Sequence, residues 1–577
     1  MILRAVLAVA LSVPPVTAPP LTAPPLTAPP VTTPPVTTPD GTRPSACPVA
    51  VPSRTTCGFL EVPERRDAPG RTIRVGYAVR EAPVAGRRPD PVVFMAGGPG
   101  AASMPLMGVL SRMFPDRDVI AVEQRGGRHS RPSLGCPEIA HALLGRLRRS
   151  PADVADAARR CRARLAEPGV DLRGYTTGEI AADVVALRGK LGYASWNLFG
   201  VGYATRVMAQ AAAADPEGVR SVVLDSFMPA GTGDAGRALA DALARMGVRE
   251  RFEAVTARLN RSPAAVPATD PLLGRAFTAR MSGDDVAAVL AQALRGGEAA
   301  AVPAVLDALA EGREEPLGPL ADAVGEGLMA RELGLYHAVR CQDGAPGDIS
   351  RLFTERTEKA VCDAWRLPAS APVRVAPEAP VYVLGGRYDP ISPPATARQA
   401  AEALPRGRFQ EFPGLAHAVF EASACARREI AAFVRDPAGH PVTPCPEARP
   451  LGELHVTAAP YRISRAPWLA APLAVFALAS LAQLAAGALK GRATTAYAGL
   501  AGVAFTGLAV QSAAGLAAES ATAAAVGVPA VVGAYTWLAG VSAVLTAATL
   551  LQRRAWPQIM TCAISGAFLV WWFTWFL

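Results

Sequence analysis

Over residues 47 to 230, the pattern of apolar and polar positions switches repeatedly between a strand type and a helix type. Short runs rich in β-branched and aromatic residues, which predict strands, are separated by longer stretches with helical patterns. One such stretch, residues 179 to 191, places four apolar residues on one side of a helix, as core-facing residues are: Ile180, Val184, Leu187 and Leu191. Strands that alternate with helices predict a parallel sheet covered by helices, an α/β fold. The clearest predicted strands begin at Pro91, Asp118, Trp196 and Ser221.

The pattern becomes mainly helical over residues 231 to 372, and strand signals resume at Val381. An insertion of this length between two strands of one sheet predicts a helical cap over the face of the sheet that carries the functional site. The core of the α/β domain is then predicted in two parts, residues 47 to 230 and residues 373 to 447. A linker, residues 448 to 466, follows.

Four long apolar stretches come after the linker, and none contains Asp, Glu, Lys or Arg. Each is long enough to cross a hydrocarbon core of about 30 Å at a helical rise of about 1.5 Å per residue. An alanine-rich soluble bundle is the alternative, but it needs a polar face at helical period, and the sequence has none. Residues 467 to 577 are therefore predicted to form an all-α transmembrane bundle. The stretches are residues 467 to 489, 494 to 517, 524 to 551 and 559 to 577.

The loops between these stretches carry a charge signal. Lys490 and Arg492 follow the first stretch, and Arg553 and Arg554 follow the third. Since basic loops stay in the cytoplasm, the α/β domain is predicted to lie outside it, in a multi-pass protein of the cell membrane. Arg462 and Arg465, on the outer side, work against this assignment. No acidic or basic residue lies within a stretch, so the bundle is interpreted as an anchor or interaction region, with no particular protein partner indicated.

The first residues of the chain differ in character from all that follow. Residues 1 to 18 combine one positive charge with a short apolar run, which is typical of a secretory signal. Pro19 would follow the cut and block processing, so an uncleaved N-terminal hydrophobic segment is the alternative. Residues 19 to 46 are rich in Pro and Thr, and a five-residue unit recurs from Val16 to Asp40. Because proline lacks the amide donor and fixes φ, this segment is predicted to be a disordered spacer.

Eight of the nine cysteines fall into four pairs that are close in sequence. Even pairing at short separations predicts disulfides and an oxidising compartment, with eight unrelated buried thiols as the alternative. No metal centre is predicted, since the sequence has no C-x-x-C and its six histidines do not cluster with the cysteines. The pairs are Cys47 with Cys57, Cys136 with Cys161, Cys341 with Cys362, and Cys425 with Cys445, and Cys562 is left over.

The distribution of basic residues argues against one class of partner, nucleic acids. The formal charge is +9 over 577 residues, but the basic residues are scattered along the chain. No Lys- and Arg-rich block is present that could follow a nucleic acid backbone, so no nucleic acid partner is predicted.

Residues 197 to 205 read as a strand, a tight turn and the start of a helix. This is the layout of the G-x-S-x-G nucleophile elbow, in which a strained turn presents a serine for acyl transfer. The sequence here is Gly200-Val-Gly202-Tyr203-Ala204, so Gly202 stands at the nucleophile position. Glycine adopts positive φ readily, and we therefore expect the elbow to keep its shape without a reactive oxygen.

A glycine-rich loop follows the first of the predicted parallel strands. Glycines let the backbone approach a carbonyl closely, so the loop is a candidate for the amide donors that bind an oxyanion. Taken alone, it is equally well interpreted as a turn. The candidate residues are Gly97, Gly98, Pro99 and Gly100, together with Tyr203 of the elbow.

Two further residues complete the order of groups that acyl transfer on this fold uses. Asp389 lies just beyond a predicted strand, and His417 follows roughly one strand and one helix later. Elbow, acid and base in this chain order match the α/β hydrolases, with the aspartate orienting the imidazole. His417 as an ordinary loop histidine is the alternative.

Short strings spread over this region match one pattern: Cys57–Pro63, Gly97–Gly100, Glu123–Gly126, Val223–Asp225 and Gly386–Asp389, together with the elbow and the paired cysteines. With these strings, residues 47 to 447 resemble the α/β-hydrolase family of secreted actinobacterial tripeptidyl aminopeptidases and proline iminopeptidases. The resemblance implies an α/β-hydrolase fold with a helical cap, and peptide-bond hydrolysis that needs no cofactor. It also implies a pocket for a peptide or another small ligand.

The chain also departs from this family. Glu123 stands where the family usually has Asp, Arg128 replaces a turn glycine, and the elbow carries Gly202 and Ala204 in place of serine and glycine. The four apolar stretches are not part of the common secreted enzyme.

Without the serine, His417 has no hydroxyl to deprotonate at the elbow. The nearest hydroxyls in sequence, Ser103 and Thr205, are not evident replacements. The sequence therefore favours a membrane-anchored pseudo-hydrolase that binds a peptide or another small ligand. Two alternatives stay open: a hydrolase in which His417 and Asp389 activate a water or a substitute nucleophile, and a protein whose four helices carry the function while the outer domain is a sensor.

Overall fold

The structure is a computed structural model that describes residues 46–147, 153–229, 235–270, 274–294, 299, 301–344, 355–370, 375–446, 453–552 and 555–577. The predicted signal segment (residues 1 to 18), nearly all of the predicted spacer (19 to 46), and the loop residues Arg553 and Arg554 lie outside the described residues.

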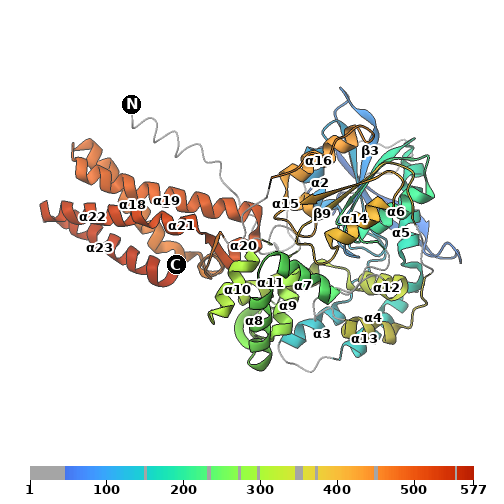
Figure 1. Ribbon diagram of the computed structural model, residues 1–577, viewed down its shortest axis with the longest axis horizontal. Coiled ribbons are helices and arrows are strands. Elements are labelled where there is room, and N and C mark those ends of the chain that lie inside the picture. The colour runs from blue at the N-terminus through green and yellow to red at the C-terminus, as the bar shows by residue number, and fades with distance from the viewer. Residues whose placement is uncertain are drawn as a thin grey trace. The chain divides into compact units, whose positions relative to one another are not determined.

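One eight-stranded sheet forms the centre of the α/β domain, with strand order β1-β2-β4-β3-β5-β6-β9-β10 (Figure 1). β2 pairs antiparallel with both β1 and β4. The remaining strands of this sheet, β4, β3, β5, β6, β9 and β10, are parallel to one another. Each of the four predicted strands is present, and β4, β5 and β9 are buried along their whole length because helices cover both faces. The bounds are β1 Thr55–Pro63, β2 Thr72–Arg80, β3 Arg88–Met95, β4 Arg117–Val122, β5 Trp196–Val201, β6 Val219–Asp225, β9 Val381–Gly386 and β10 Gly407–Phe412.

Helices pack on the two faces in separate hydrophobic clusters. Apolar residues of α5, α6 and α14 belong to the cluster on one face, and residues of α2, α15 and α16 belong to the cluster on the other. Of the predicted stripe on α5, Ile180, Val184 and Leu187 are fully buried, and Leu191 at the end of the helix is partly buried. The bounds are α2 Met107–Met113, α5 Thr177–Leu191, α6 Ala204–Ala214, α14 Pro394–Glu402, α15 Val419–Ala422 and α16 Ala424–Arg435.

The insertion between β6 and β9 is mainly helical, as the sequence predicts, and it also contains a β-hairpin. Two helices from an earlier part of the chain, α3 (Pro137–Leu147) and α4 (Val154–Ala166), pack against it, which the sequence pattern does not reveal. The insertion comprises α7 Ala235–Arg245, α8 Arg249–Arg261, β7 Ala264–Thr269, β8 Ala276–Met281, α9 Gly283–Ala293, α10 Val302–Ala310, α11 Leu317–Ala330, α12 Leu333–Asp343 and α13 Glu355–Trp365.

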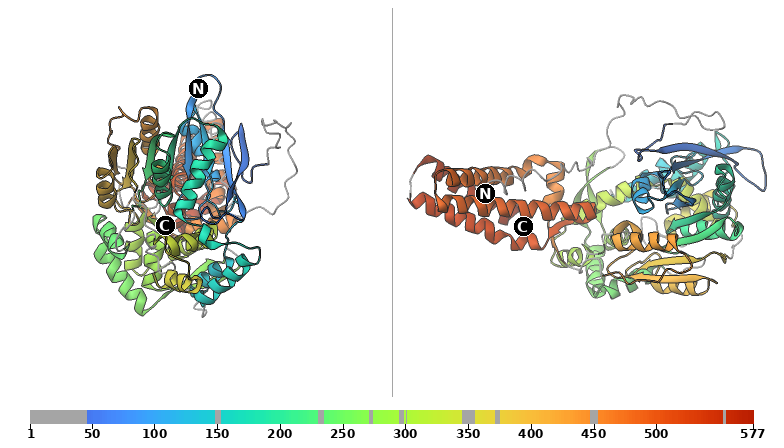
Figure 2. Two further views of the ribbon diagram at one scale, coloured as in Figure 1. Left: turned by 90° about the vertical axis from the view of Figure 1, so that its right-hand side faces the viewer. Right: turned by 90° about the horizontal axis from the view of Figure 1, so that it is seen from above.

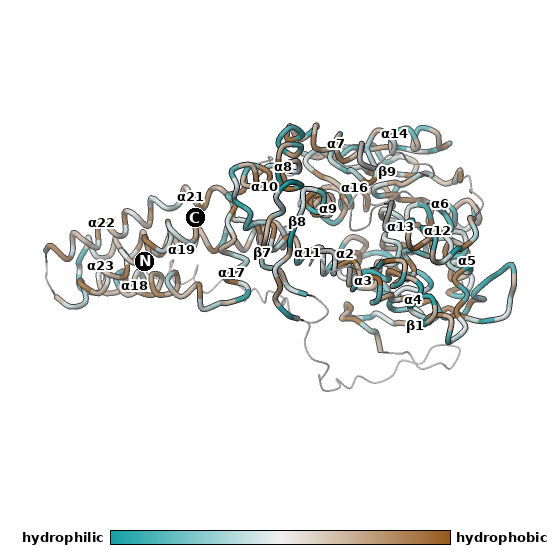
Figure 3. The backbone as a smooth tube through the Cα atoms, turned by 90° about the horizontal axis from the view of Figure 1, so that it is seen from below, coloured by the Kyte–Doolittle hydropathy of each residue, from teal (hydrophilic) through white to brown (hydrophobic). Residues whose placement is uncertain are grey.

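The C-terminal region holds four helices that are long and apolar enough to cross a membrane: Pro467–Leu489, Ala493–Ala518, Val531–Gln552 and Trp556–Phe576. They form one bundle, coloured orange to red in Figure 2. Within it α18 packs on α19, α19 on α22, α22 on α23 and α23 on α18. Their backbones are coloured mainly brown and white in Figure 3, and large apolar side chains such as Leu478 and Val544 are exposed on their outer sides. Such a surface suits lipid. The bounds are α18 Ala471–Leu489, α19 Ala493–Glu519, α22 Thr536–Gln552 and α23 Trp556–Trp571.

The start of the third stretch and the predicted linker differ from expectation. Residues 524 to 551 are not one helix, because Gly527–Pro529 (β12) pairs antiparallel with Leu454–Val456 (β11). The third candidate span therefore begins at Val531. Short helices flank these strands: α17 (Ala459–Arg465), α20 (Ala521–Val526) and α21 (Val531–Ala534).

The four predicted cysteine pairs are confirmed as pairs at disulfide distance, with Cα–Cα separations of 5.2–6.0 Å. Cys562 is free.

Candidate active site

The elbow lies between the end of β5 at Val201 and the start of α6 at Ala204. Gly202 has φ +54°, a left-handed conformation in which a side chain is strained. Its N–H donates to the carbonyl of Asp225 at 2.9 Å, which fixes the turn to the neighbouring strand. A Cβ on Gly200 would lie 2.6 Å from the carbonyl oxygen of Ala204, so this crossing requires a glycine at position 200.

Asp389 and His417 lie beside the elbow and contact each other. Oδ2 of Asp389 is 2.9 Å from Nδ1 of His417. The other carboxylate oxygen accepts hydrogen bonds from the amides of Ile391 at 2.8 Å and Ser392 at 2.9 Å, so the carboxylate is held from both sides. Asp389 is fully buried and the His417 side chain is 11% exposed. A proton on Nδ1 shared with the carboxylate leaves Nε2 free to act as a base.

Nε2 of His417 points at the position where the nucleophile would begin. A Cβ on Gly202 would lie 2.7 Å from this nitrogen and 3.3 Å from the neighbouring Cε1. Real side chains do not approach that closely, so the imidazole occupies space that a serine side chain would need. The pocket of the missing hydroxymethyl group is thus partly filled by the base itself.

The glycine-rich loop lies against the elbow. A Cβ on Gly97 would be 2.7 Å from the carbonyl oxygen of Val201 and 3.6 Å from the amide nitrogen of Tyr203. Gln124 holds the loop, because its Nε2 donates to the carbonyls of Ala96 and Gly97 at 2.8 Å and its Oε1 accepts from the amide of Gly100 at 2.9 Å. The structure therefore brings the predicted loop residues to the elbow.

The side chain of Tyr203 points away from the glycine-rich loop. The hydroxyl of Tyr203 is 2.9 Å from Oγ1 of Thr177 and is buried, so only its backbone faces the loop. The peptide bond before Pro99 is cis, and Pro99 itself is buried.

The two hydroxyls nearest in sequence are both engaged in structural hydrogen bonds. Oγ of Ser103 accepts from the amide of Ala96 at 3.0 Å. Oγ1 of Thr205 donates to the carbonyl of Gly202 at 2.5 Å and accepts from the amide of Met228 at 3.1 Å. Both side chains are fully buried, so neither is placed as a substitute nucleophile.

Asp225 and Ser226 at the end of β6 hold the histidine loop, a role that sequence reasoning missed. The Asp225 carboxylate accepts from the amides of Val419 at 3.0 Å and Phe420 at 2.7 Å. Oγ of Ser226 accepts from the amide of Ala418 at 3.0 Å. Burial raises the pKa of Asp225 to about 7. The available signal was Asp225 at the end of the buried apolar run Val222–Leu224.

Glu123, one of the departures from the resembled family, binds the backbone that directly follows the glycine-rich loop. Its Oε1 accepts from the amides of Ser103 at 3.1 Å and Met104 at 3.0 Å. The side chain is buried, and this burial raises its pKa to about 7.

The cap contacts both halves of the site. The amide of Glu332, at the start of α12, donates to the carbonyl of Gly100 at 3.3 Å, and the amide of His417 donates to the carbonyl of Leu294 at 3.0 Å. Arg128, the residue that replaces a turn glycine, pairs with the Glu332 carboxylate at 3.2 Å. The site therefore lies under the cap, with Gly202 buried and Gly97 and Gly98 partly exposed.

Within the described ranges, one group of side chains has metal-ligand spacing: Cys136, Glu138 and Cys161. The two sulfurs form a disulfide and Glu138 pairs with Arg164 at 2.6 Å, so this group does not fit a metal ion.

Comparisons with known proteins agree with this geometry. A family model described as alpha/beta hydrolase fold matches residues 90–424. The serine protease Hip1 of Mycobacterium tuberculosis and that of Mycobacterium bovis are each 26% identical to this chain over 193 residues, a match that covers 31% of this chain and 36% of the relative. The chain thus matches about a third of the length of these curated relatives.

Solved structures with a similar fold include proline iminopeptidase from Mycobacterium smegmatis, at 17% identity and TM-score 0.34, with 66% of this chain and 98% of that chain covered. A thermophilic esterase from Thermogutta terrifontis matches at 15% identity and TM-score 0.33, with 66% and 97% covered.

Proposed function

Because this chain belongs to the alpha/beta hydrolase fold family, we propose that it is a ligand-binding member that has lost serine catalysis. The observation that carries the proposal is Gly202, which adopts the elbow conformation with Nε2 of His417 in the space of the missing side chain. No acyl-enzyme forms on a glycine. In serine hydrolases, removal of the nucleophile costs about 10⁶ in rate and leaves roughly 10³ to 10⁴ over water.

The ligand we propose is a peptide or a small molecule with a peptide-like carbonyl. Gly97 and Gly98 are partly exposed, and we propose that their amides donate to that carbonyl, as in an oxyanion hole. The tripeptidyl aminopeptidase-like motifs support this class, and so does the protease name of the relatives that match. The proposed binding domain comprises residues 47 to 447, with residues 231 to 372 as its cap.

We place this domain outside the cytoplasm of a cell-membrane protein. The four candidate spans support membrane association. Four cysteine pairs at disulfide distance and the basic loop after the first span support the outer location.

A fluorophosphonate probe tests the loss of the nucleophile on the purified full chain. We expect no labelling of the wild-type protein, and peptide and ester hydrolysis at the level of the His417→Ala variant. Labelling of the wild-type protein that His417→Ala abolishes would refute the proposal. Two further variants, Gly202→Ser and Gly202→Ser/His417→Ala, form a matched pair. Fluorophosphonate labelling of the first but not of the second would show that the base can still activate a serine.

One observation favours a second candidate function. The Asp389–His417 pair is intact at 2.9 Å, so Nε2 could take a proton from a water that attacks the substrate directly. This hydrolase would resist the fluorophosphonate but lose peptide hydrolysis in both His417→Ala and Asp389→Asn. Equal hydrolysis by these variants and the wild type would exclude it.

A further inference from the structure

A cavity of about 880 Å³ lies where the α/β domain meets the membrane bundle. On one side its wall includes Gly414 and Leu415, which precede His417 by three and two residues, and the first turns of α16. On the other side its wall includes residues of β11, α19 and α21. We call it the juxtamembrane cavity. Its volume falls within the range of about 300–1,000 Å³ that is typical of small-molecule sites.

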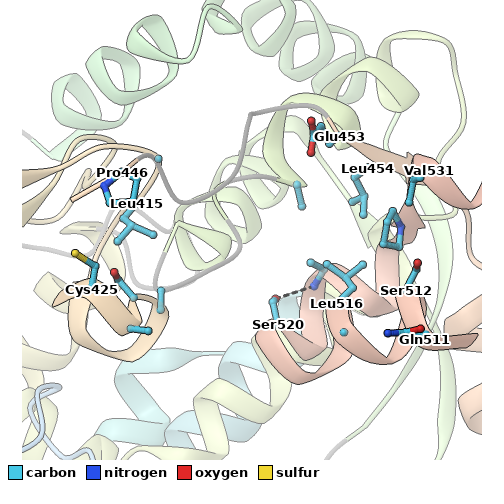
Figure 4. Close-up of a pocket in the computed structure, with 18 of the residues that line it drawn as sticks. Leu415, Cys425, Pro446, Glu453, Leu454, Gln511, Ser512, Leu516, Ser520 and Val531 are labelled. Atoms are coloured by element: carbon cyan, nitrogen blue, oxygen red, sulfur yellow. Dashed lines mark hydrogen bonds between the residues drawn. The ribbon is translucent and has the colours of Figure 1, made fainter. Parts of the chain in front are cut away.

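The wall on the membrane side combines apolar side chains with the polar residues Gln511, Ser512 and Ser520, a mixture that suits the level where the bilayer ends. Leu508, Leu516 and Val531 line it, and Figure 4 shows Leu516, Leu454 and Val531 across the cavity from Leu415. At about 1.5 Å per residue, the 27 residues of α19 extend about 40 Å, beyond a hydrocarbon core of about 30 Å. The opposite end of α19 follows directly on Arg492, so the excess length lies at the cavity end. The residues from Leu508 to Leu516 therefore straddle the boundary between acyl chains and headgroups.

The wall on the domain side carries positive charge. Arg427 and Arg428 of α16 line the cavity, and with Arg112 of α2 they also line an adjoining groove of about 400 Å³. Within the described part of the chain, no carboxylate forms an ion pair with these three arginines. Burial, and then the charges of Arg112 and Arg428, lower the pKa of Arg427, as expected for a cluster that lacks an anion. Glu453, on the opposite wall, is the one acidic residue among the described lining residues.

We propose that the juxtamembrane cavity binds one anionic phospholipid from the surrounding bilayer. The phosphate lies against Arg427 and Arg428, where charge-assisted hydrogen bonds from guanidinium groups favour it. An acyl chain continues along Leu508 and Leu516 into the hydrocarbon region. The charge on one wall and the apolar surface on the other match the two halves of such a lipid, and the site does not depend on the chemistry at Gly202.

The test uses the purified full chain and measures lipid retention by native mass spectrometry and titration. The probes are dioleoyl phosphatidylglycerol and dioleoyl phosphatidylcholine, which share acyl chains, and inorganic phosphate as competitor. We expect phosphatidylglycerol to bind at least tenfold more tightly than phosphatidylcholine, with no displacement by phosphate at equal concentration. Arg427→Gln/Arg428→Gln should remove this preference, whereas Arg435→Gln, an exposed residue of the same helix outside the cavity, should keep it.

A second variant tests the apolar half. Ser512 lines the cavity on α19, so Ser512→Trp should fill it and reduce phosphatidylglycerol binding at least tenfold. Val510→Trp, at an exposed position of the same helix outside the lining, is the control and should bind as the wild type does. Equal binding of the two lipids, or an unchanged preference in the arginine variant, would overturn the proposal. Displacement by inorganic phosphate would overturn it too, because the site would then be one for a free anion.

Discussion

At the scale of single residues, the contact between position 202 and His417 decides what the site can do. A glycine at φ +54° removes the strain that a serine would carry, and the imidazole lies within 2.7 Å of where Cβ would stand. Strain and crowding therefore act together against any side chain at this position. A serine placed here would have to displace a ring that Asp389 holds by its other nitrogen.

Gly202→Ala tests this coupling. We expect the substitution to destabilise the protein by about 1–3 kcal/mol from positive φ alone, with a further loss from the contact with Nε2. In Gly202→Ala/His417→Ala only the backbone strain remains, so the double variant should lose less than the sum of the single variants. Thermal unfolding of the full chain in detergent measures the cycle, and additive losses would contradict the crowding.

Glu123 gives a prediction on pH. Burial raises its pKa from 4.5 to about 7, so the folded chain binds this proton more tightly than the unfolded chain does. The stabilisation is complete below about pH 4.5 and is lost as the pH rises through about 7. The thermal midpoint should therefore fall between pH 5 and pH 8, and fall less in Glu123→Gln. The Gln side chain keeps an oxygen that can accept the hydrogen bonds from the amides of Ser103 and Met104.

The matched control for this titration is Glu81→Gln, at an exposed position, which should retain the full dependence. Some dependence should also remain in Glu123→Gln, because burial raises the pKa of Asp225 to about 7 as well. If the pH dependence of the thermal midpoint were identical in Glu123→Gln and the wild type, the titration of Glu123 would not contribute to it.

At the scale of elements, one carboxylate connects the cap to the helix before the membrane bundle. Asp322 of α11 accepts from the hydroxyl of Tyr461 on α17 at 2.5 Å and pairs with Arg465 at 3.2 Å. Its other oxygen accepts from the amide of Thr269 in the cap hairpin at 2.5 Å. We expect Asp322→Ala to speed amide hydrogen exchange in α17 and in the hairpin. Glu326→Ala, at an exposed position of the same helix, should leave both unchanged, and equal exchange in the two variants would contradict the connection.

The sequence predicts elements well where one period dominates, and less well where a distant partner decides. The stripe on α5 and the four central strands follow from local pattern alone. The third apolar stretch was wrongly extended to residue 524, because Gly527–Pro529 is as apolar as a span and only its pairing with Leu454–Val456 makes it a strand. Elbow, acid and base could be ordered along the chain, but the distance from Nε2 to position 202 depends on how the loops after β9 and β10, which carry Asp389 and His417, fold.

At the scale of the whole molecule, cysteine pairing and the charge of the membrane loops bear on the same property, the side of the membrane on which the domain lies. Disulfides persist in oxidising compartments, and basic loops stay in the cytoplasm. Both criteria support the proposal that the α/β domain lies outside and the loop at Lys490 inside. The juxtamembrane cavity then faces the outer leaflet.

Labelling of intact cells with a membrane-impermeant maleimide tests this placement. In a Cys562→Ser background, Val84→Cys, at a position that is 83% exposed on the α/β domain, should be labelled without permeabilisation. Lys490→Cys, exposed in the loop between α18 and α19, should be labelled only after permeabilisation. The reverse pattern would place the domain in the cytoplasm. The four disulfides would then face a reducing compartment, and the cavity would draw its lipid from the inner leaflet.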